Sequence, residues 1–318
     1  MRVVVIGGTG HLGTSLAPRL VEAGHDVTCV SRQQREPYHA HPAWTRVRHV
    51  ELDREAAEAD GTFGQRIVDL QAEVVVDLIC YTLESATHLV DSLRGVVQHF
   101  LHCGTIWVHG PSARVPTTEA EPKHPLGDYG RRKAAIESYL LEQARAGGFP
   151  ATLLHPGHLV GPGWVPINPA ANFNVQVYSD LATGRELLLP HLGMETLHHV
   201  HADDVAQGFL QAIGNRHAAV GESFHVVSAA ALTLRGYAEH MAAWFGREPR
   251  LRFVPWDDWR RTASDKDAEV TYNHISHSSH CSIEKARARL GYAPRYSSLE
   301  AVQEAVTWLM DNNLIRRD

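Results

Sequence analysis

The chain has 318 residues, of which 44% are hydrophobic and 21% are charged, so its ordinary globular composition excludes disorder as the default. A net charge of -6, with histidine counted as neutral, gives no overall positive field to attract nucleic acid or anionic lipid. The chain contains no apolar run of about 18 residues and no signal-peptide pattern, so we expect a cytoplasmic protein without membrane or nucleic-acid partners.

The first 155 residues alternate strand and helix patterns. Residues 3–6 are continuously apolar, as expected for a strand covered on both faces, and residues 12–23 have helical apolar spacing. Further strands are expected over 27–30, 47–52, 74–79, 100–103 and 151–155. Further helices are expected over 62–71, 84–94 and 128–146. This alternation predicts an α/β fold with a Rossmann-type, doubly wound parallel sheet.

The rhythm changes after residue 156, where prolines and glycines cluster and no further strand–helix repeat is evident. A helix is expected over 205–213 and a strand over 224–227. We interpret residues 1–155 as a dinucleotide-binding domain and residues 156–318 as mainly a smaller substrate-binding domain. Segments near 200–228 are expected to return to the first domain.

The turn between the first strand and the first helix carries three glycines, Gly7, Gly10 and Gly13. A turn without Cβ atoms lets the backbone approach a pyrophosphate closely, and the helix N-terminus at His11 and Leu12 offers unpaired N–H groups and a positive dipole end. The strand–turn–helix context makes this glycine pattern a specific prediction of a dinucleotide site.

The end of the second strand indicates which dinucleotide is bound. NAD sites usually place a carboxylate there for the ribose 2′-hydroxyl, whereas this chain has Ser31 and Arg32, with Arg35 nearby. A guanidinium can donate several hydrogen bonds to a 2′-phosphate. We therefore prefer NADP over NAD. Asp53, after the third strand, is interpreted either as an acceptor for the adenine amino group or as a helix N-cap.

Tyr129 and Lys133 stand four residues apart in a predicted helix and therefore share one face. A neighbouring ammonium is expected to lower the pKa of the phenol, which can then exchange a proton with a substrate oxygen while hydride moves at the adjoining carbon. Thr105, just after the strand over 100–103, is placed to orient that oxygen. The competing interpretation of Thr105 is a local backbone cap.

The cysteines and histidines give no specific sign of a metal. None of the four cysteines forms a CxxC pair, so buried, reduced thiols are predicted. Histidines gather over 198–201 and 274–280, but neither run has HxxxH or HExxH spacing. We predict no metal site.

Taken together, these features resemble the extended short-chain dehydrogenases/reductases, the family of sugar epimerases and dehydratases. The opening is similar to its TGxxGxxG, with Ile6 where Thr is usual. The other matching segments are GTIWVHG at 104–110 (its SSxxVYG), YGRRK at 129–133 (YxxxK), HPGHLVGP at 155–162 (RPxNVxGP), VHADDVA at 200–206 (VHVxDVA) and ARARLGYAP at 286–294 (its closing LGW/YxP element).

The resemblance implies a C-terminal substrate domain of interleaved segments, a sugar-like substrate and a homodimer formed through helices that include the Tyr–Lys helix. It implies that Tyr129 is the acid/base, that Lys133 holds the nicotinamide ribose, and that Thr105 orients the substrate. His155 is included among the cofactor-binding residues on the same ground.

The departures from the family pattern narrow the reaction. Dehydratases of 4-keto sugars carry Asp-Glu after the catalytic Thr, where this chain has Ile106 and Trp107, so dehydration is not expected. His155 and His158 stand where nucleotide-sugar enzymes favour Arg and Asn. His158 is interpreted either as facing the substrate pocket or as a loop histidine. Candidates for substrate contacts, each with a structural role as the alternative, are Trp164, Asn172, Asn174 and His201.

Three functions remain open at this point. The first is an NAD(P)-dependent epimerase or oxidoreductase that acts on a sugar-like substrate, a class that includes nucleotide sugars. The second is an NADP(H)-dependent dehydrogenase or reductase of a small carbonyl or polyol. The third is a non-enzymatic, dinucleotide-sensing Rossmann protein, which the presence of both Tyr129 and Lys133 disfavours.

Overall fold

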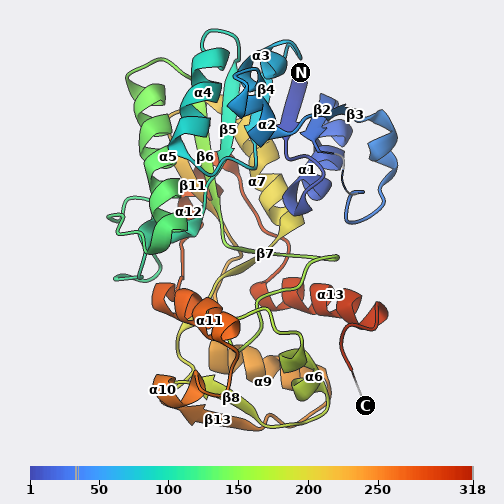
Figure 1. Ribbon diagram of the computed structural model, residues 1–318, viewed down its shortest axis with the longest axis vertical. Coiled ribbons are helices and arrows are strands. Elements are labelled where there is room, and N and C mark those ends of the chain that lie inside the picture. The colour runs from blue at the N-terminus through green and yellow to red at the C-terminus, as the bar shows by residue number, and fades with distance from the viewer. Residues whose placement is uncertain (33, 35, 317–318) are drawn as a thin grey trace.

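A computed structural model describes residues 1–32, 34 and 36–316; Arg35, a candidate for reading the cofactor, lies outside the described residues. Seven of the described strands form one parallel sheet in the order β11-β6-β5-β4-β1-β2-β3 (Figure 1). In chain order these strands are β1 (Arg2–Ile6), β2 (Asp26–Ser31), β3 (Arg48–Glu51), β4 (Val74–Asp77), β5 (His99–Cys103), β6 (Ala151–Pro156) and β11 (Ser223–Val226).

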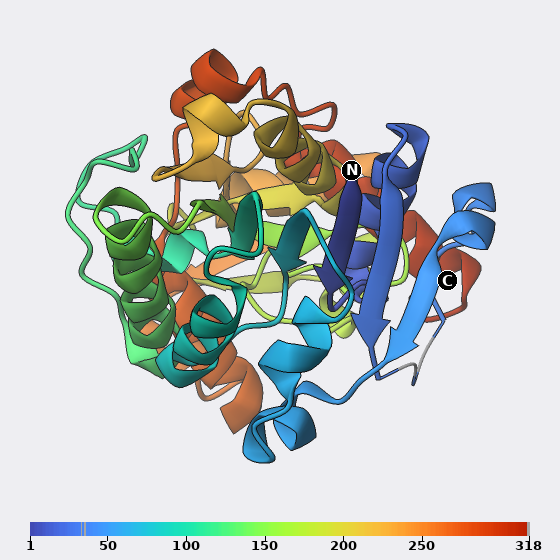
Figure 2. The same ribbon diagram turned by 90° about the horizontal axis from the view of Figure 1, so that it is seen from above.

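Helices cover both faces of this sheet, as the view from above shows (Figure 2). Successive residues of β1 point to opposite faces, so Val3 and Val5 belong to one core and Val4 and Ile6 to the other. The first core is covered by α1 (His11–Glu22), α7 (Ala202–Gly214) and α12 (Glu284–Leu290). The second is covered by α2 (Arg54–Ala59), α3 (Phe63–Val68), α4 (Leu83–Leu93) and α5 (Gly127–Arg145).

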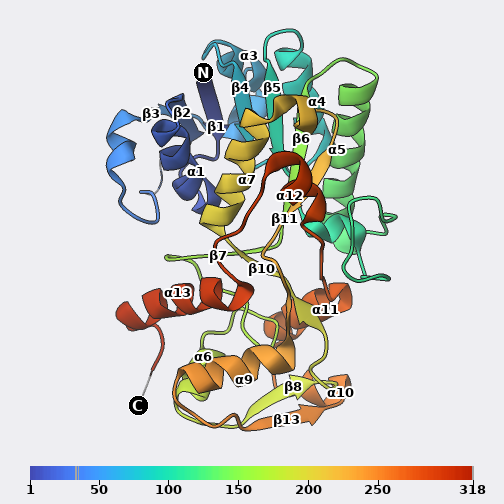
Figure 3. The ribbon, with the colours of Figure 1, turned by 180° about the vertical axis from the view of Figure 1, so that it is seen from behind.

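A smaller lobe with its own apolar core lies below the carboxyl edge of the sheet (Figure 3). Its strands form two-stranded pairs rather than extending the main sheet. They are β7 (His158–Val160) with β10 (His199–His201), β8 (Leu187–Pro190) with β13 (Leu251–Val254), and β9 (Thr196–Leu197) with β12 (Leu232–Thr233). Its helices are α6 (Gln176–Ala182), α9 (Leu234–Trp244), α10 (Trp256–Trp259), α11 (Asp265–His277) and α13 (Ser298–Asp311).

Three short elements complete the described chain, namely the 3-10 helices η1 (Pro42–Arg46) and η2 (Ile106–His109) and the helix α8 (Arg216–Ala219). The predicted doubly wound parallel fold is confirmed, with strand ends within two residues of those expected from the sequence. The helix expected over 62–71 is shorter, and α2 was missed because this six-residue helix buries little apolar surface.

None of the helices in the described ranges combines the length and the apolar character needed to cross a lipid bilayer. The four cysteines are free and buried, as predicted.

Several histidines are packed into the interior as neutral rings. Among the described histidines, burial lowers the pKa of three to about 3 and of three others to about 4, namely His11, His99 and His198, then His109, His199 and His274. Each of these rings takes up a proton near its ordinary pKa of 6.5 only once it is exposed by unfolding.

We therefore expect the free energy of unfolding to be highest above pH 6.5 and to fall as the pH is lowered towards 4. Each such histidine contributes a slope of about 1.4 kcal/mol per pH unit, because the unfolded state binds the extra proton. Urea denaturation at a series of pH values measures this slope. His99→Gln should reduce the slope by the contribution of one proton, about 1.4 kcal/mol per pH unit. His217 is exposed, so His217→Gln should leave the slope unchanged. Identical slopes for wild type and His99→Gln would contradict this explanation.

Candidate active site

The glycine-rich turn after β1 has the geometry of a phosphate cradle. Gly7 has a φ of +85° and donates its N–H to Val30 O at 2.8 Å, a conformation that L side chains rarely adopt. A Cβ on Gly13 would lie 2.4 Å from Gly8 O, so only glycine lets α1 approach the turn this closely. The N-cap Gly10 supplies no side-chain cap and the first turn has no acidic residue, which leaves N–H groups for an anion.

A cavity of about 400 Å³ opens beside this turn at the carboxyl ends of β1, β2, β3 and β4. Its size is within the range of small-molecule sites, and it lies where the strand order reverses between β1 and β4, the usual dinucleotide crevice of such sheets. Five of the predicted cofactor residues line it, namely Gly7, Gly10, Ser31, Arg32 and Asp53. Asp53 also caps α2 by accepting from Ala56 N at 3.2 Å, which confirms the N-cap interpretation, while the contact with adenine stays a prediction.

The other predicted cofactor residues lie behind or beside this cavity. Leu12 is buried in the core on the α1 side of the sheet, which leaves only its backbone near the turn. The His11 ring stacks flat on Trp164 at a centroid distance of 4.9 Å, and the Tyr38 ring meets both edge-on. The His11 side chain therefore packs against other rings and is not among the described residues that line the cavity.

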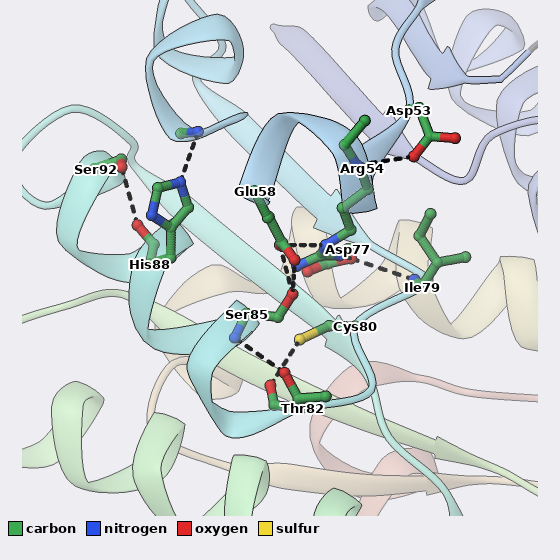
Figure 4. A network of polar contacts seen from close by, with 12 residues as sticks. Asp53, Arg54, Glu58, Asp77, Ile79, Cys80, Thr82, Ser85, His88 and Ser92 are labelled. Atoms are coloured by element: carbon green, nitrogen blue, oxygen red, sulfur yellow. Dashed lines mark hydrogen bonds and ion pairs between the residues drawn. The ribbon is translucent and has the colours of Figure 1, made fainter. Parts of the chain in front are cut away.

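A buried ionic network that the sequence reading missed forms the inner wall of the cavity (Figure 4). Arg54 donates to Asp77 Oδ1 at 2.8 Å and to Glu58 Oε1 at 2.7 Å, and its guanidinium lies 5.0 Å from the Phe63 ring centre. Ser85 donates to the Glu58 carboxylate. The sequence carries one sign of this network, because Asp77 ends an otherwise apolar strand. A carboxylate buried at such a position requires a polar or charged partner.

Tyr129 lies at the start of α5 beside Thr105, the N-cap of η2. Although 44% of Tyr129 is exposed, desolvation raises the pKa of its phenol, and hydrogen bonding from the Thr105 side chain offsets this only in part. The predicted lowering of the Tyr129 pKa by Lys133 is therefore wrong for this structure. The edge of the Trp107 ring approaches the Tyr129 ring at a centroid distance of 6.1 Å.

Lys133 is buried on the inner face of α5, one turn after Tyr129. Its Nζ donates to Cys80 O and Cys103 O, both at 2.8 Å, and lies 5.0 Å from the centre of the Tyr81 ring. Burial lowers the pKa of this amine. The ammonium thus reaches the loop after β4, in which Ile79 and Tyr81 line the cavity.

His155 lies under Thr105 rather than in the cavity wall. Its Nδ1 accepts the Thr105 N–H at 2.9 Å, and its Nε2 lies 3.1 Å from Glu137 Oε1. His158 lies on the far side of Trp107, where four rings from both lobes gather. Trp107 stacks on His277 of α11 at 4.1 Å, and His274 lies 5.1 Å from both Trp107 and His158.

The remaining substrate candidates make internal contacts. The Asn172 amide donates to Thr271 Oγ1 at 3.0 Å, and Asn174 donates to Asp267 at 3.4 Å. His201 caps α7 by accepting from Asp203 N. The histidine runs are likewise bonded to backbone, as in His199 Nε2 with Ile167 O and His277 Nδ1 with Asn273 O.

One group among the described residues, Asp77, Cys80 and His102, has potential ligand atoms within 4.8 Å of one another. Arg54 is already paired with Asp77, and the Lys133 ammonium lies against Cys80 O. Two fixed cations beside the cluster oppose a divalent ion, so we assign no metal to it.

The residues of the cavity fit a nicotinamide dinucleotide. The glycine cradle, which Cβ atoms would fill, and the uncapped start of α1 suit a pyrophosphate. Asp53 and Arg32 line the cavity after β3 and β2, where they would face the adenine and ribose of such a cofactor. Thr105, Tyr129 and Lys133 stand beyond the loop after β4, at the end where the redox ring of such a cofactor would lie.

Comparisons with known proteins match most of the chain. A model of the NAD dependent epimerase/dehydratase family matches residues 3–226. The chain is 24% identical over 314 residues to the chloroplast stem-loop binding protein of 41 kDa b of Arabidopsis thaliana, covering 96% of this chain and 78% of that protein. It is 24% identical over 324 residues to a UDP-glucose 4-epimerase of Corynebacterium glutamicum, covering 96% and 94%.

Among solved structures, a UDP-glucose 4-epimerase of Thermotoga maritima, crystallised with UDP-glucose, matches with a TM-score of 0.73 and 21% identity, covering 98% of this chain and all of that one. At this level of identity the likeness establishes the fold.

Gly13→Ala should prevent the close approach of α1 to the turn. We expect at least a tenfold loss of affinity for NAD⁺ or NADP⁺, measured by calorimetry, and a loss of about 1–3 kcal/mol in unfolding free energy from the overlap. The matched control is Gly214→Ala, where an added Cβ meets no atom within 4 Å. Wild-type cofactor affinity in Gly13→Ala would show that the turn is not the phosphate site.

Proposed function

The chain belongs to the NAD dependent epimerase/dehydratase family, and from this we propose that it is an NAD(P)-dependent extended short-chain dehydrogenase/reductase acting on a sugar-like substrate. The reaction is hydride transfer at a hydroxyl- or carbonyl-bearing carbon. The observation that carries the proposal is the convergence of Tyr129, Thr105 and Lys133 at the same sheet edge as the glycine cradle.

The bound nicotinamide would supply or accept the hydride. Tyr129 exchanges the proton at the substrate oxygen, and Thr105 orients that oxygen. Because burial raises the pKa of Tyr129, the phenol is protonated at neutral pH and ready to donate to a carbonyl oxygen. Lys133, one helical turn away, is the residue that would hold the nicotinamide ribose.

The rings of Trp107, His274 and His277 near Tyr129 indicate which type of reaction the site suits. The residue after Ile106 is Trp107, whose ring is held in a stack with His277. No carboxylate pair follows Thr105, so water elimination is not proposed. Burial keeps His274 neutral at physiological pH, with its pKa lowered to about 4. Uncharged, flat rings of this kind pack well against the face of a polyhydroxylated sugar ring and are less suited to a charged substrate group.

Two forms of the reaction use the same residues. An epimerase oxidises and then reduces one carbon and keeps its cofactor, whereas a dehydrogenase or reductase exchanges cofactor at each turnover. The relatives named UDP-glucose 4-epimerase support the first form with a nucleotide sugar. The relatives named 2'-dehydrokanamycin reductase and dTDP-6-deoxy-L-talose 4-dehydrogenase support the second.

Several finer assignments accompany this proposal. Arg32 beside Ser31 in the cavity wall supports NADP over NAD. The lobe built mainly from residues after 156 is the substrate domain. Four free thiols support a cytoplasmic location. A homodimer through α5 rests on the resemblance alone, and its interface would have to pair the exposed Arg131, Arg132 and Glu142.

The competing function is a non-enzymatic one, in which the fold senses a dinucleotide or binds RNA. The relative named as a stem-loop binding protein supports it. The net charge of -6 does not favour a phosphate backbone as ligand, and a binding protein has no need of the Tyr129–Thr105 arrangement.

Mass spectrometry of the small molecules released on denaturing the purified protein tests the form of the reaction. We expect a nicotinamide dinucleotide near one equivalent if the enzyme is an epimerase, because the cofactor is recycled within the site. A site that loses its cofactor on purification supports the dehydrogenase or reductase. The released species also decides between NADP and NAD.

Tyr129→Phe tests whether the protein is an enzyme. We expect turnover to fall about 10²- to 10⁴-fold, the usual contribution of a positioned acid/base, while cofactor affinity stays within about twofold. UDP-glucose, UDP-galactose and small carbonyls with NADPH or NADH form the substrate panel. Tyr139→Phe on the same helix is the matched control. Unchanged turnover in Tyr129→Phe would exclude the proposed chemistry.

A further inference from the structure

We propose that His155 and Glu137 form a positioning pair, in which a buried carboxylate orients a neutral imidazole that holds the backbone of Thr105 in place. The inference deepens the proposed function and rests on it, since it takes Thr105 to orient the substrate oxygen. Neither His155 nor Glu137 lines the cofactor cavity, so both act through Thr105.

The His155 ring is fixed against the segment that carries Thr105. Its Nδ1 accepts the Thr105 N–H at 2.9 Å, and a Cβ on Gly104 would lie 2.2 Å from the same nitrogen. An Nδ1 that accepts a hydrogen bond carries no proton. The proton of the neutral ring therefore lies on Nε2, which faces Glu137 Oε1 at 3.1 Å.

Glu137 is held for this task by its place on α5. It follows Tyr129 and Lys133 by eight and four residues, so the three share one face of the helix. Burial alone would raise the pKa of this carboxyl, but His155 and the Lys123 ammonium outweigh it, and the pKa lies below its ordinary value. The ionised carboxylate, with Lys123 as its ion-pair partner, lies 3.1 Å from the imidazole Nε2, an ion-pair contact without hydrogen-bond geometry in this structure.

The arrangement ties the Thr105 backbone to the tautomer of His155, because only an unprotonated Nδ1 accepts the Thr105 N–H. A second proton on the His155 ring must go to Nδ1. Nδ1 would then be a donor instead of an acceptor, and its N–H would point at the Thr105 N–H. The charged and titratable groups facing the ring come from five segments: Glu137 on α5, Lys123 and Glu119 before it, His102 on β5, His109 in η2 and His225 on β11, whose ring centre is 6.2 Å away.

Nuclear magnetic resonance of the full chain with ¹⁵N-labelled histidine and threonine tests the pair without an enzyme assay. His155→Asn identifies the ring signals by their loss, and Thr105→Ser identifies the amide. We expect an unprotonated Nδ1 and a protonated Nε2 at neutral pH. A protonated Nδ1 at neutral pH would overturn the proposal.

Two conservative variants separate positioning from packing. His155→Asn keeps an acceptor near the Nδ1 position, so the Thr105 amide should stay near its wild-type position. Glu137→Gln removes the charge and adds a side-chain N–H donor, so the Nε2–H tautomer of His155 should give way to a mixture with the Nδ1–H form, and the Thr105 amide should shift. An unchanged ring tautomer and an unchanged Thr105 amide in Glu137→Gln would contradict the orienting role.

His99→Gln is the matched control, because His99 is equally buried but begins β5 at the opposite edge of the sheet and bonds Thr152. It should leave the Thr105 amide unmoved at every pH; a shift as large as that from the His155 variants would count against a specific role. If the spectra behave as expected while Tyr129→Phe keeps full turnover, the pair stands as geometry and the proposed enzymatic function fails.

Discussion

The buried ammonium of Lys133 is the constraint on which the active face depends. A buried charge is tolerated only when its protons find acceptors, and here Cys80 O and Cys103 O supply two at 2.8 Å. These carbonyls follow β4 and end β5, so Lys133 is satisfied only where α5 lies across the carboxyl ends of both strands. Tyr129, one turn earlier on the same face, is thereby carried to Thr105.

The same sheet edge brings the two halves of the chemistry together. All strands of a parallel sheet end at one edge, so the glycine turn after β1 and the loop after β4 are neighbours. That loop serves both sides, because Ile79 and Tyr81 line the cavity while the carbonyl of Cys80, between them, holds Lys133. The cavity and Lys133 therefore share one segment of three consecutive residues.

Local sequence patterns predicted the sheet and the glycine turn, because a run such as residues 3–6 or a triplet such as Gly7, Gly10 and Gly13 has its meaning within a few residues. Contacts between distant segments could not be read in this way. Arg54 meets Asp77 across 23 residues, and Thr105 meets His155 across 50. The Tyr129 pKa was misjudged for the same reason: helical spacing shows which cation is near, but not that packing of distant segments desolvates the phenol and raises its pKa.

Two buried ionic clusters flank Lys133 and keep its surroundings ordered. On the cavity side Arg54 joins Asp77 and Glu58; on the other, Lys123 joins Glu137 and, through it, His155. Each cluster contains its own counter-charge, so removing one member would leave a buried charge uncompensated. Polar groups fixed before the reaction need little rearrangement in the transition state. The two sides differ in one respect: a guanidinium and carboxylates hold the cavity wall, whereas an imidazole that accepts the Thr105 N–H holds the substrate side of the site.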